Sequence, residues 1–112
     1  MKLPNGEKAV VDIAKLRDYS LNAQHEGGSH KARVFRSALG IDTDDAEWLR
    51  EQLLEIAREG EAVEVAASVF GRRFNIDFVL IRGEKSVTIR SSWIVEYGTD
   101  FPRLTTCYVK GK

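Results

Sequence analysis

Both histidines of the chain lie in one short stretch, His25–Arg33, which reads HEGGSHKAR. Imidazole accepts and returns a proton near neutral pH, so His25 and His30 are candidates for acid–base chemistry. Lys31 and Arg33 follow at the start of an expected helix, where free backbone amides also attract anions. This combination predicts a seat for a phosphate group beside a side chain that can transfer a proton.

The same stretch also has a purely structural interpretation. A glycine pair forms a loop, and Ser29 is a residue type that caps helices by accepting a hydrogen bond from a free backbone amide. The basic residues that follow, Arg36 above all, would then be a solvated helix face. The cap explains where the helix begins, but not why two imidazoles and two cations meet at its anion-attracting end.

Other reactive side chains fit no catalytic pattern. Cys107 alternates with core positions, which favours a packed thiol over a reactive one. Ser91 and Ser92 lack the G-x-S-x-G pattern that presents a nucleophilic serine. Asp44 and Asp45 suit the start of a helix. One cysteine and two histidines spaced H-x-x-x-x-H match no common zinc motif, so we expect neither a metal nor a cofactor.

Helical periodicity predicts three helices in the first half of the chain. They are expected over residues 13–21 after the capping residue Asp12, over 30–39 before Gly40, and from Thr43 and Asp44 to Gly60. The apolar stripes are Val34, Phe35, Ala38 and Leu39 in the second helix, and Leu49, Leu53, Ile56 and Ala57 in the third. A DNA-reading helix-turn-helix is rejected, because the third helix opens with acids that would face the phosphates.

After Gly60 the pattern alternates and predicts strands over residues 62–68, 72–81, 85–97 and 103–110. The positions expected to face the helices are Phe74, Ile76, Phe78 and Leu80, then Val87, Ile89, Trp93 and Val95, then Thr105, Cys107 and Val109. Helices followed by antiparallel strands predict an α+β fold. The N-terminal helices would pack on one face of a mostly antiparallel sheet of about four strands.

The opposite face of this sheet collects polar side chains. Its members are Arg73, Asn75, Asp77, Thr88, Arg90, Ser92, Thr106, Tyr108 and Lys110. One solvated face is ordinary for an antiparallel sheet. Hydroxyls, a tyrosine and fixed cations are nevertheless the donors that bind phosphate oxygens, which makes Arg73, Arg90 and Ser92 candidate RNA contacts.

Composition limits the class of protein. With 112 residues the chain is expected to be one domain, with a helical half over 1–60 and a sheet half over 61–112. Its 17 basic and 17 acidic residues cancel, so contact with nucleic acid would need a local patch. A single cysteine fits a reducing compartment. The lack of a long apolar run predicts a cytoplasmic protein without membrane contact.

Five stretches distributed along the chain resemble a bacterial family of about this length with no settled function. They are LPNGEKAVVD, KLRDYSLN, HEGGSHKARVFRSALG, the WI of SSWIV, and FPRLTTCYV. Members of that family stand alone or form the C-terminal tips of polymorphic toxins. The order of helices and then a sheet ending in a T-x-Y strand is in turn similar to the superfamily that groups barnase, EndoU, bacterial colicin tRNases and RelE.

The resemblance implies a metal-independent ribonuclease. The superfamily drives a ribose 2′-hydroxyl onto the adjacent phosphate and leaves a cyclic phosphate end. Carried onto this sequence, it implies proton transfer by two of His25, His30 and Tyr108, charge stabilisation by Lys31, Arg33 and Arg90, and hydrogen-bond donation by Thr106 and Tyr108. Which histidine would be the base stays open.

Two functions remain after this reasoning. One is a toxin-type endoribonuclease that acts on RNA and is neutralised by a cognate antitoxin or immunity protein. The other is a non-catalytic binding module, such as an antitoxin, an immunity protein or an assembly adaptor. Balanced charge and a pI of about 6.7 favour the second, because free ribonucleases are often basic. The RNA target and the formation of a homodimer are left open.

Overall fold

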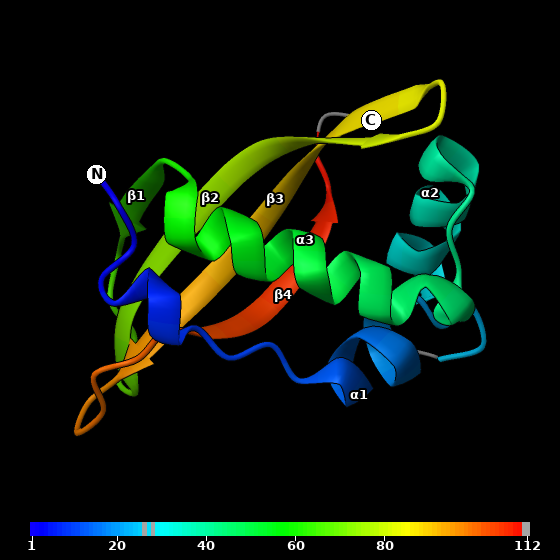
Figure 1. The fold of residues 1–112 in the computed structure, drawn as a ribbon. Coiled ribbons are helices and arrows are strands. Elements are labelled where there is room, and N and C mark those ends of the chain that lie inside the picture. Colours follow the sequence, from blue (N-terminus) through cyan, green and yellow to red (C-terminus); the bar gives the residue numbers. More distant parts are fainter. Residues whose placement is uncertain (26, 28, 111–112) are drawn as a thin grey trace.

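A four-stranded antiparallel sheet lies behind the helices in the computed structural model, which describes residues 1–25, 27 and 29–110 (Figure 1). In chain order the main elements are α1 (Ile13–Lys15), the π-helical turn η2 (Leu16–Ser20), α2 (Ser29–Leu39), α3 (Ala46–Glu59), β1 (Ala62–Val65), β2 (Gly71–Arg82), β3 (Lys85–Glu96) and β4 (Arg103–Val109). The strands are neighbours in chain order, β1-β2-β3-β4. This arrangement confirms the predicted α+β fold.

The first helical segment is shorter and less regular than predicted. Asp12 caps it as expected, with Oδ1 accepting a hydrogen bond from Ala14 N at 2.9 Å, but α-helical geometry ends at Lys15. A π-helical turn follows and buries Leu16 in the core. Such turns are frequent at functional sites, and this one carries Tyr19.

The second helix begins one residue earlier than predicted. Ser29, predicted as the cap, is the first residue of the helix, and residue 28 lies outside the described residues. Ala32 takes a fully buried position, whereas Val34, expected in the apolar stripe, is half-buried. Gly40 has a φ of 71°, which confirms that this helix ends in the left-handed conformation.

The third helix starts from a capping box at Asp42, the residue before the predicted start at Thr43. Asp42 Oδ1 accepts a hydrogen bond from Asp44 N at 2.9 Å, and Asp45 Oδ2 accepts one from Asp42 N at 3.0 Å. A 3₁₀ turn over Thr43–Asp45 leads into α3. The helix ends at Gly60 as predicted, where an added Cβ would lie only 2.7 Å from the Ile56 carbonyl oxygen.

The sheet has a covered face, packed against the helices, and an open face. The covered face carries the core side chains Phe74, Ile76, Leu80, Ile89 and Trp93, each at most 2 % exposed. They pack with apolar residues of α2 and α3 in one core. In Figure 1, α3 crosses in front of the strands. The ranges of β2, β3 and β4 match the prediction to within one residue at each end, whereas β1 ends at Val65, short of the predicted residue 68.

A β-bulge in β4 overturns one predicted core position. Regular alternation from Cys107 would place Thr105 on the covered face, but the register shifts between Ser92 and Trp93, and Trp93 pairs with Leu104. Leu104 is therefore buried, and Thr105 is exposed with its hydroxyl donating to Ser92 O at 3.1 Å. The prediction for Thr105 was wrong because an extra residue in one strand breaks the two-residue period.

The N-terminal segment covers part of the β4 edge. Val10 forms a parallel bridge with Arg103, and Leu104 N donates to Val10 O at 3.0 Å. The remaining part of that edge faces α1, η2 and the start of α2. None of the helices in the described ranges is both long enough and apolar enough to cross a membrane.

Candidate functional site

The open face of the sheet carries the predicted polar residues in aligned rows. Residues directly opposite each other in an antiparallel pair share a face. One row contains Val63, Asn75, Ser92 and Thr106, and the next contains Asp77, Arg90 and Tyr108. Strand register therefore brings side chains that are distant in the sequence into one surface.

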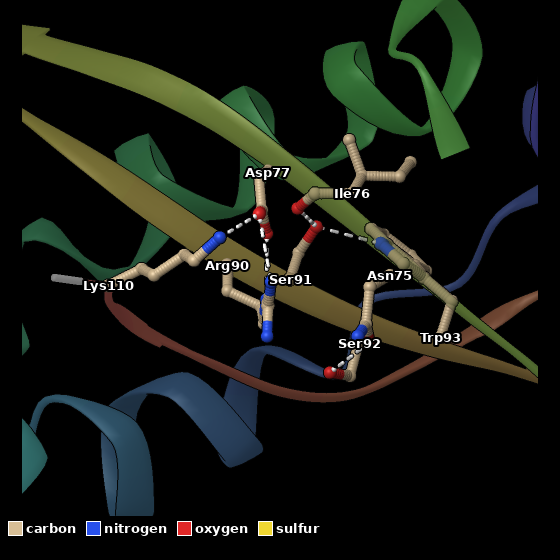
Figure 2. A network of polar contacts seen from close by, with 8 residues as sticks. All are labelled: Asn75, Ile76, Asp77, Arg90, Ser91, Ser92, Trp93 and Lys110. Atoms are coloured by element: carbon tan, nitrogen blue, oxygen red, sulfur yellow. Dashed lines mark hydrogen bonds and ion pairs between the residues drawn. The ribbon is translucent and has the colours of Figure 1, made fainter. Parts of the chain in front are cut away.

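Asp77 is the centre of an ionic network on this face (Figure 2). Its Oδ1 accepts a hydrogen bond from Arg90 Nε at 2.8 Å, and its Oδ2 accepts from Arg90 Nη2 at 3.0 Å and from Lys110 Nζ at 2.7 Å. These hydrogen bonds, from Arg90 first and then Lys110, lower the pKa of Asp77 to about 2. Asp77 and, more weakly, Tyr108 raise the pKa of Arg90. One carboxylate between two cations leaves the network positively charged.

Lys31 joins the open face from α2. Its Nζ donates to Thr106 Oγ1 at 3.3 Å and lies 5.2 Å from the centre of the Tyr108 ring, within cation–π range. Because α2 packs on the covered face, the Lys31 side chain reaches around the β4 edge to make these contacts. Among the described residues, Lys31 forms no ion pair with a carboxylate, so its charge stays available.

A cleft of about 520 Å³ opens beside this contact, and we call it the β4 cleft. Its lining consists of Asp12, Ala14, Lys15, Tyr19, Lys31, Thr105 and Thr106. The bulge turns Thr105 outward, which is why two consecutive threonines line the same cleft. Lys15 Nζ donates to Thr105 O at 3.3 Å and brings a second ammonium group to the lining.

His25 does not line the β4 cleft but contacts Tyr19, which does. Its ring meets the Tyr19 ring edge-on with centroids 4.7 Å apart, and its Nδ1 accepts a hydrogen bond from Gly27 N at 3.0 Å. Tyr19 also donates its hydroxyl to Gly27 O at 3.3 Å, which ties the loop to the π-helical turn. An imidazole that accepts at Nδ1 carries its proton on Nε2.

Three predicted site residues lie apart from the β4 cleft. His30 and Arg33 are exposed on α2, and Arg33 is two residues from Lys31, a spacing at which helix side chains do not share a face. Arg73 is exposed on the open face opposite Ile94. Within the described part of the chain, no hydrogen bond or ion pair joins any of these three to the cleft residues.

Two potential nucleophiles have structural surroundings. Cys107 is fully buried, and burial raises the pKa of its thiol to about 12, so the reactive thiolate is not formed near neutral pH. Ser91 is fully buried as well, with its Oγ donating to Ile76 O and accepting from Trp93 Nε1, each at 2.9 Å (Figure 2). Both side chains belong to the core.

Sequence patterns did not mark five residues of the β4 cleft as site residues: Asp12, Ala14, Lys15, Tyr19 and Thr105. Asp12 was predicted to cap a helix, and it does. Lys15 and Tyr19 lie in or next to the π-helical turn, which changes the direction in which the side chains of this segment point. A larger hollow of about 900 Å³ shares Asp12 and Lys15 with the cleft, but none of the predicted site residues lines it.

The charge of this region differs from that of the whole chain. Cations outnumber acids around the β4 cleft and the Asp77 network, with Lys15, Lys31, Arg90 and Lys110 against Asp12 and Asp77. In the described ranges, no group of three or more histidine, cysteine, aspartate or glutamate side chains is arranged to hold a metal ion. The region is suited to an anion.

The fold and this region define a small α+β domain with a cationic, hydroxyl-lined cleft at the rim of an open sheet. The chain belongs to a family described as a domain of unknown function, DUF6883, whose model matches residues 2–111. Comparisons with curated proteins and with solved structures give no match.

Proposed function

We propose that the protein is a toxin-type endoribonuclease that cleaves RNA by attack of a ribose 2′-hydroxyl on the adjacent phosphodiester. The observation that carries the proposal is the convergence of Lys31, Thr106 and Tyr108 at the rim of the β4 cleft. An ammonium that no described carboxylate neutralises is there combined with a hydroxyl and a phenol. Such a set suits a phosphate group whose charge increases during reaction.

The proposed reaction uses two proton transfers. The 2′-oxygen forms a bond to phosphorus while the bond to the 5′-oxygen breaks, which leaves a 2′,3′-cyclic phosphate and a free 5′-hydroxyl. A base takes the 2′-proton and an acid gives a proton to the 5′-oxygen. We draw the acid and the base from His25, which packs against the cleft residue Tyr19, and Tyr108, whose ring lies beside Lys31.

Charge stabilisation falls to the cations. Lys31 would contact the non-bridging oxygens, and Arg90, next to Tyr108 in the same row, would supply a second donor from the open face. Arg33 and Arg73 lie apart from this position and are left to contacts with the flanking RNA backbone, which add affinity without selecting a sequence. His30 has no role in this proposal.

Cleavage of total RNA in the presence of EDTA tests the proposal. The wild type should produce fragments that end in a 2′,3′-cyclic phosphate, detected by mass spectrometry. Lys31→Ala should slow cleavage by about 100-fold, the effect of removing one charge-stabilising donor. Tyr108→Phe, which removes one of the two groups proposed to transfer protons, should slow cleavage by roughly 100-fold or more.

Arg36→Ala is the matched control, because it removes another cation from the same helix at an exposed position. Its rate should stay within about twofold of the wild type. No cleavage by the wild type, or an equal loss of rate in Lys31→Ala and Arg36→Ala, would overturn the proposal.

A second candidate function is favoured by exposed apolar side chains at one end of the sheet. Val69 is 86 %, Phe70 71 % and Tyr97 64 % exposed, and Tyr97 N donates to Phe70 O at 2.9 Å. Exposed apolar groups that lie together mark protein-binding surfaces. The protein would then be a binding module, or a toxin that a cognate antitoxin or immunity protein covers there. Growth arrest on induction without a partner would favour the toxin.

A further inference from the structure

A second hollow on the open face lies two strands away from the Lys31 contact. It measures about 440 Å³ and is lined by Glu61, Val63, Val65, Asn75, Asp77 and Arg90. We propose that this open-face hollow binds one base of the RNA strand and selects a base with two adjacent hydrogen-bond acceptors. Guanine, through O6 and N7, and cytosine, through O2 and N3, have this property. The inference rests on the proposed function and names the substrate feature that it would select.

Asn75 supplies the first donor. Its Oδ1 accepts a hydrogen bond from Ser92 Oγ at 2.8 Å, which fixes the orientation of the amide (Figure 2). Nδ2 is therefore the atom turned away from Ser92, and it carries two hydrogens that can be donated. Asn75 lines the hollow, so this amide group can meet the edge of a base.

Arg90 supplies the second donor. Its Nε and Nη2 donate to the two oxygens of Asp77, Tyr108 also interacts with the guanidinium, and the five N–H groups of an arginine leave further donors in the same plane. The ion pair holds that plane in place at the border of the hollow. Both Asp77 oxygens already accept hydrogen bonds from cations, so the polar side of the hollow formed by these residues offers donors more than acceptors.

The rest of the wall consists of two valines and Glu61, whose carboxylate pairs with the N-terminal ammonium group. Val63 lies directly opposite Asn75 in the β1–β2 pair and is 61 % exposed, and Val65 is the next residue of β1 on the same face. An aliphatic surface beside two donors is the combination that a flat base requires, because its faces are apolar and its edges are polar. A simple phosphate site would not need such a wall.

The spacing fits one RNA strand that crosses both sites. Thr106 on β4 and Asn75 on β2 lie in one row, separated by β3. Adjacent strands are about 4.8 Å apart, so the two positions are separated by roughly 10 Å. A phosphate held by Lys31 and a base in the open-face hollow would then belong to the same or to neighbouring nucleotides.

Binding of RNA that cannot be cleaved tests this inference separately from catalysis. Four short 2′-O-methyl oligonucleotides, with A, C, G or U at one central position in a constant sequence, would be titrated with the protein by fluorescence anisotropy. The wild type should bind the G or the C oligonucleotide roughly tenfold more tightly than the A and U ones. The comparison of the G and C arms identifies the base.

Asn75→Asp is the decisive variant. It keeps the shape of the side chain and the acceptor for Ser92 Oγ, but replaces the Nδ2 donor with an acceptor. The ratio of affinities between the preferred oligonucleotide and the A oligonucleotide should fall by roughly tenfold. Gln52→Ala, which removes a carboxamide from α3, should leave that ratio unchanged.

The outcomes separate the two proposals. Equal binding of all four oligonucleotides, no binding of any of them, or an unchanged ratio in Asn75→Asp would overturn the base-binding inference, whether or not total RNA is cleaved. Base-selective binding that Asn75→Asp abolishes, together with no cleavage of total RNA, would support the inference while the ribonuclease proposal fails.

Discussion

The two faces of the sheet are built from alternating residues of the same strands, yet they use polar groups in opposite ways. On the covered face, the Ser91 hydroxyl both donates to Ile76 O and accepts from Trp93 Nε1, so the buried indole N–H is satisfied inside the protein. On the open face, Asn75 accepts from Ser92 and Arg90 donates to Asp77 and interacts with Tyr108, while both side chains remain in contact with solvent.

This difference separates stability from function along each strand. Buried polar groups must find partners within the fold, because an unsatisfied one costs about 1–3 kcal/mol. Exposed polar groups have water as an alternative partner and can therefore be kept for a ligand. Substitutions at neighbouring positions should consequently have very different effects, and two pairs of variants and one single variant test that expectation.

The largest effect is expected from truncating apolar side chains of β2. Ile76→Ala should lower the free energy of unfolding by about 2–5 kcal/mol, because Ile76 is fully buried and its removal leaves a cavity. Val79→Ala, on the open face of the same strand, should change it by less than about 0.5 kcal/mol, since Val79 is 61 % exposed. Urea denaturation measures both. Similar losses in the two variants would contradict the assignment of the faces.

An intermediate effect is expected from two adjacent serines. Ser91→Ala should cost about 1–3 kcal/mol, because it leaves the buried Trp93 Nε1 without its partner. Ser92→Ala removes a hydrogen bond to Asn75 on the open face, where Ser92 is half-buried, and should cost less than about 1 kcal/mol. The same denaturation curves report the difference, and tryptophan fluorescence follows the surroundings of Trp93 directly. Equal losses of stability in the two variants would mean that the two hydrogen bonds of Ser91 Oγ contribute no more to folding than the exposed one of Ser92.

The smallest effect on stability is expected from Asp77→Asn. The ion pairs with Arg90 and Lys110 should contribute less than about 1 kcal/mol at neutral pH, because the three side chains remain 30–43 % exposed. The same change should strengthen RNA binding at low salt, since it leaves both cations without their carboxylate. Weaker RNA binding by Asp77→Asn would show that the held position of Arg90 matters more than the net charge.

The contribution of Asp77 should also depend on pH. Its pKa in the folded protein is about 2, below the ordinary value of 3.8, so folding favours the ionised form. The stabilisation is therefore complete above about pH 4 and is lost as the pH falls through about 2. The difference in unfolding free energy between the wild type and Asp77→Asn should shrink over this range. A difference that stays constant from about pH 5 to pH 2 would contradict the lowered pKa.

Much of the candidate site follows from periodicity. Alternation along β2 and β3 was enough to place Arg90, Ser92 and Asp77 on one face, and helical spacing placed Lys31 near the start of α2. The contact between Lys31 and Thr106 did not follow, because it depends on how α2 sits against the β4 edge. Tyr19 was missed because the π-helical turn changes which residues of that segment share a side.

The sequence by itself determined the α+β order, the strand ranges of the hairpin and the division of each strand into an apolar and a polar side. These features follow from the spacing of apolar residues, which repeats every 2 residues in a strand and about every 3.6 residues in a helix. Only the tertiary structure decided that a bulge turns Thr105 into the β4 cleft, that Lys31 reaches around the sheet edge, and that Asp77 engages two cations. Those arrangements depend on contacts between residues far apart in the chain, and such contacts leave no periodic signal.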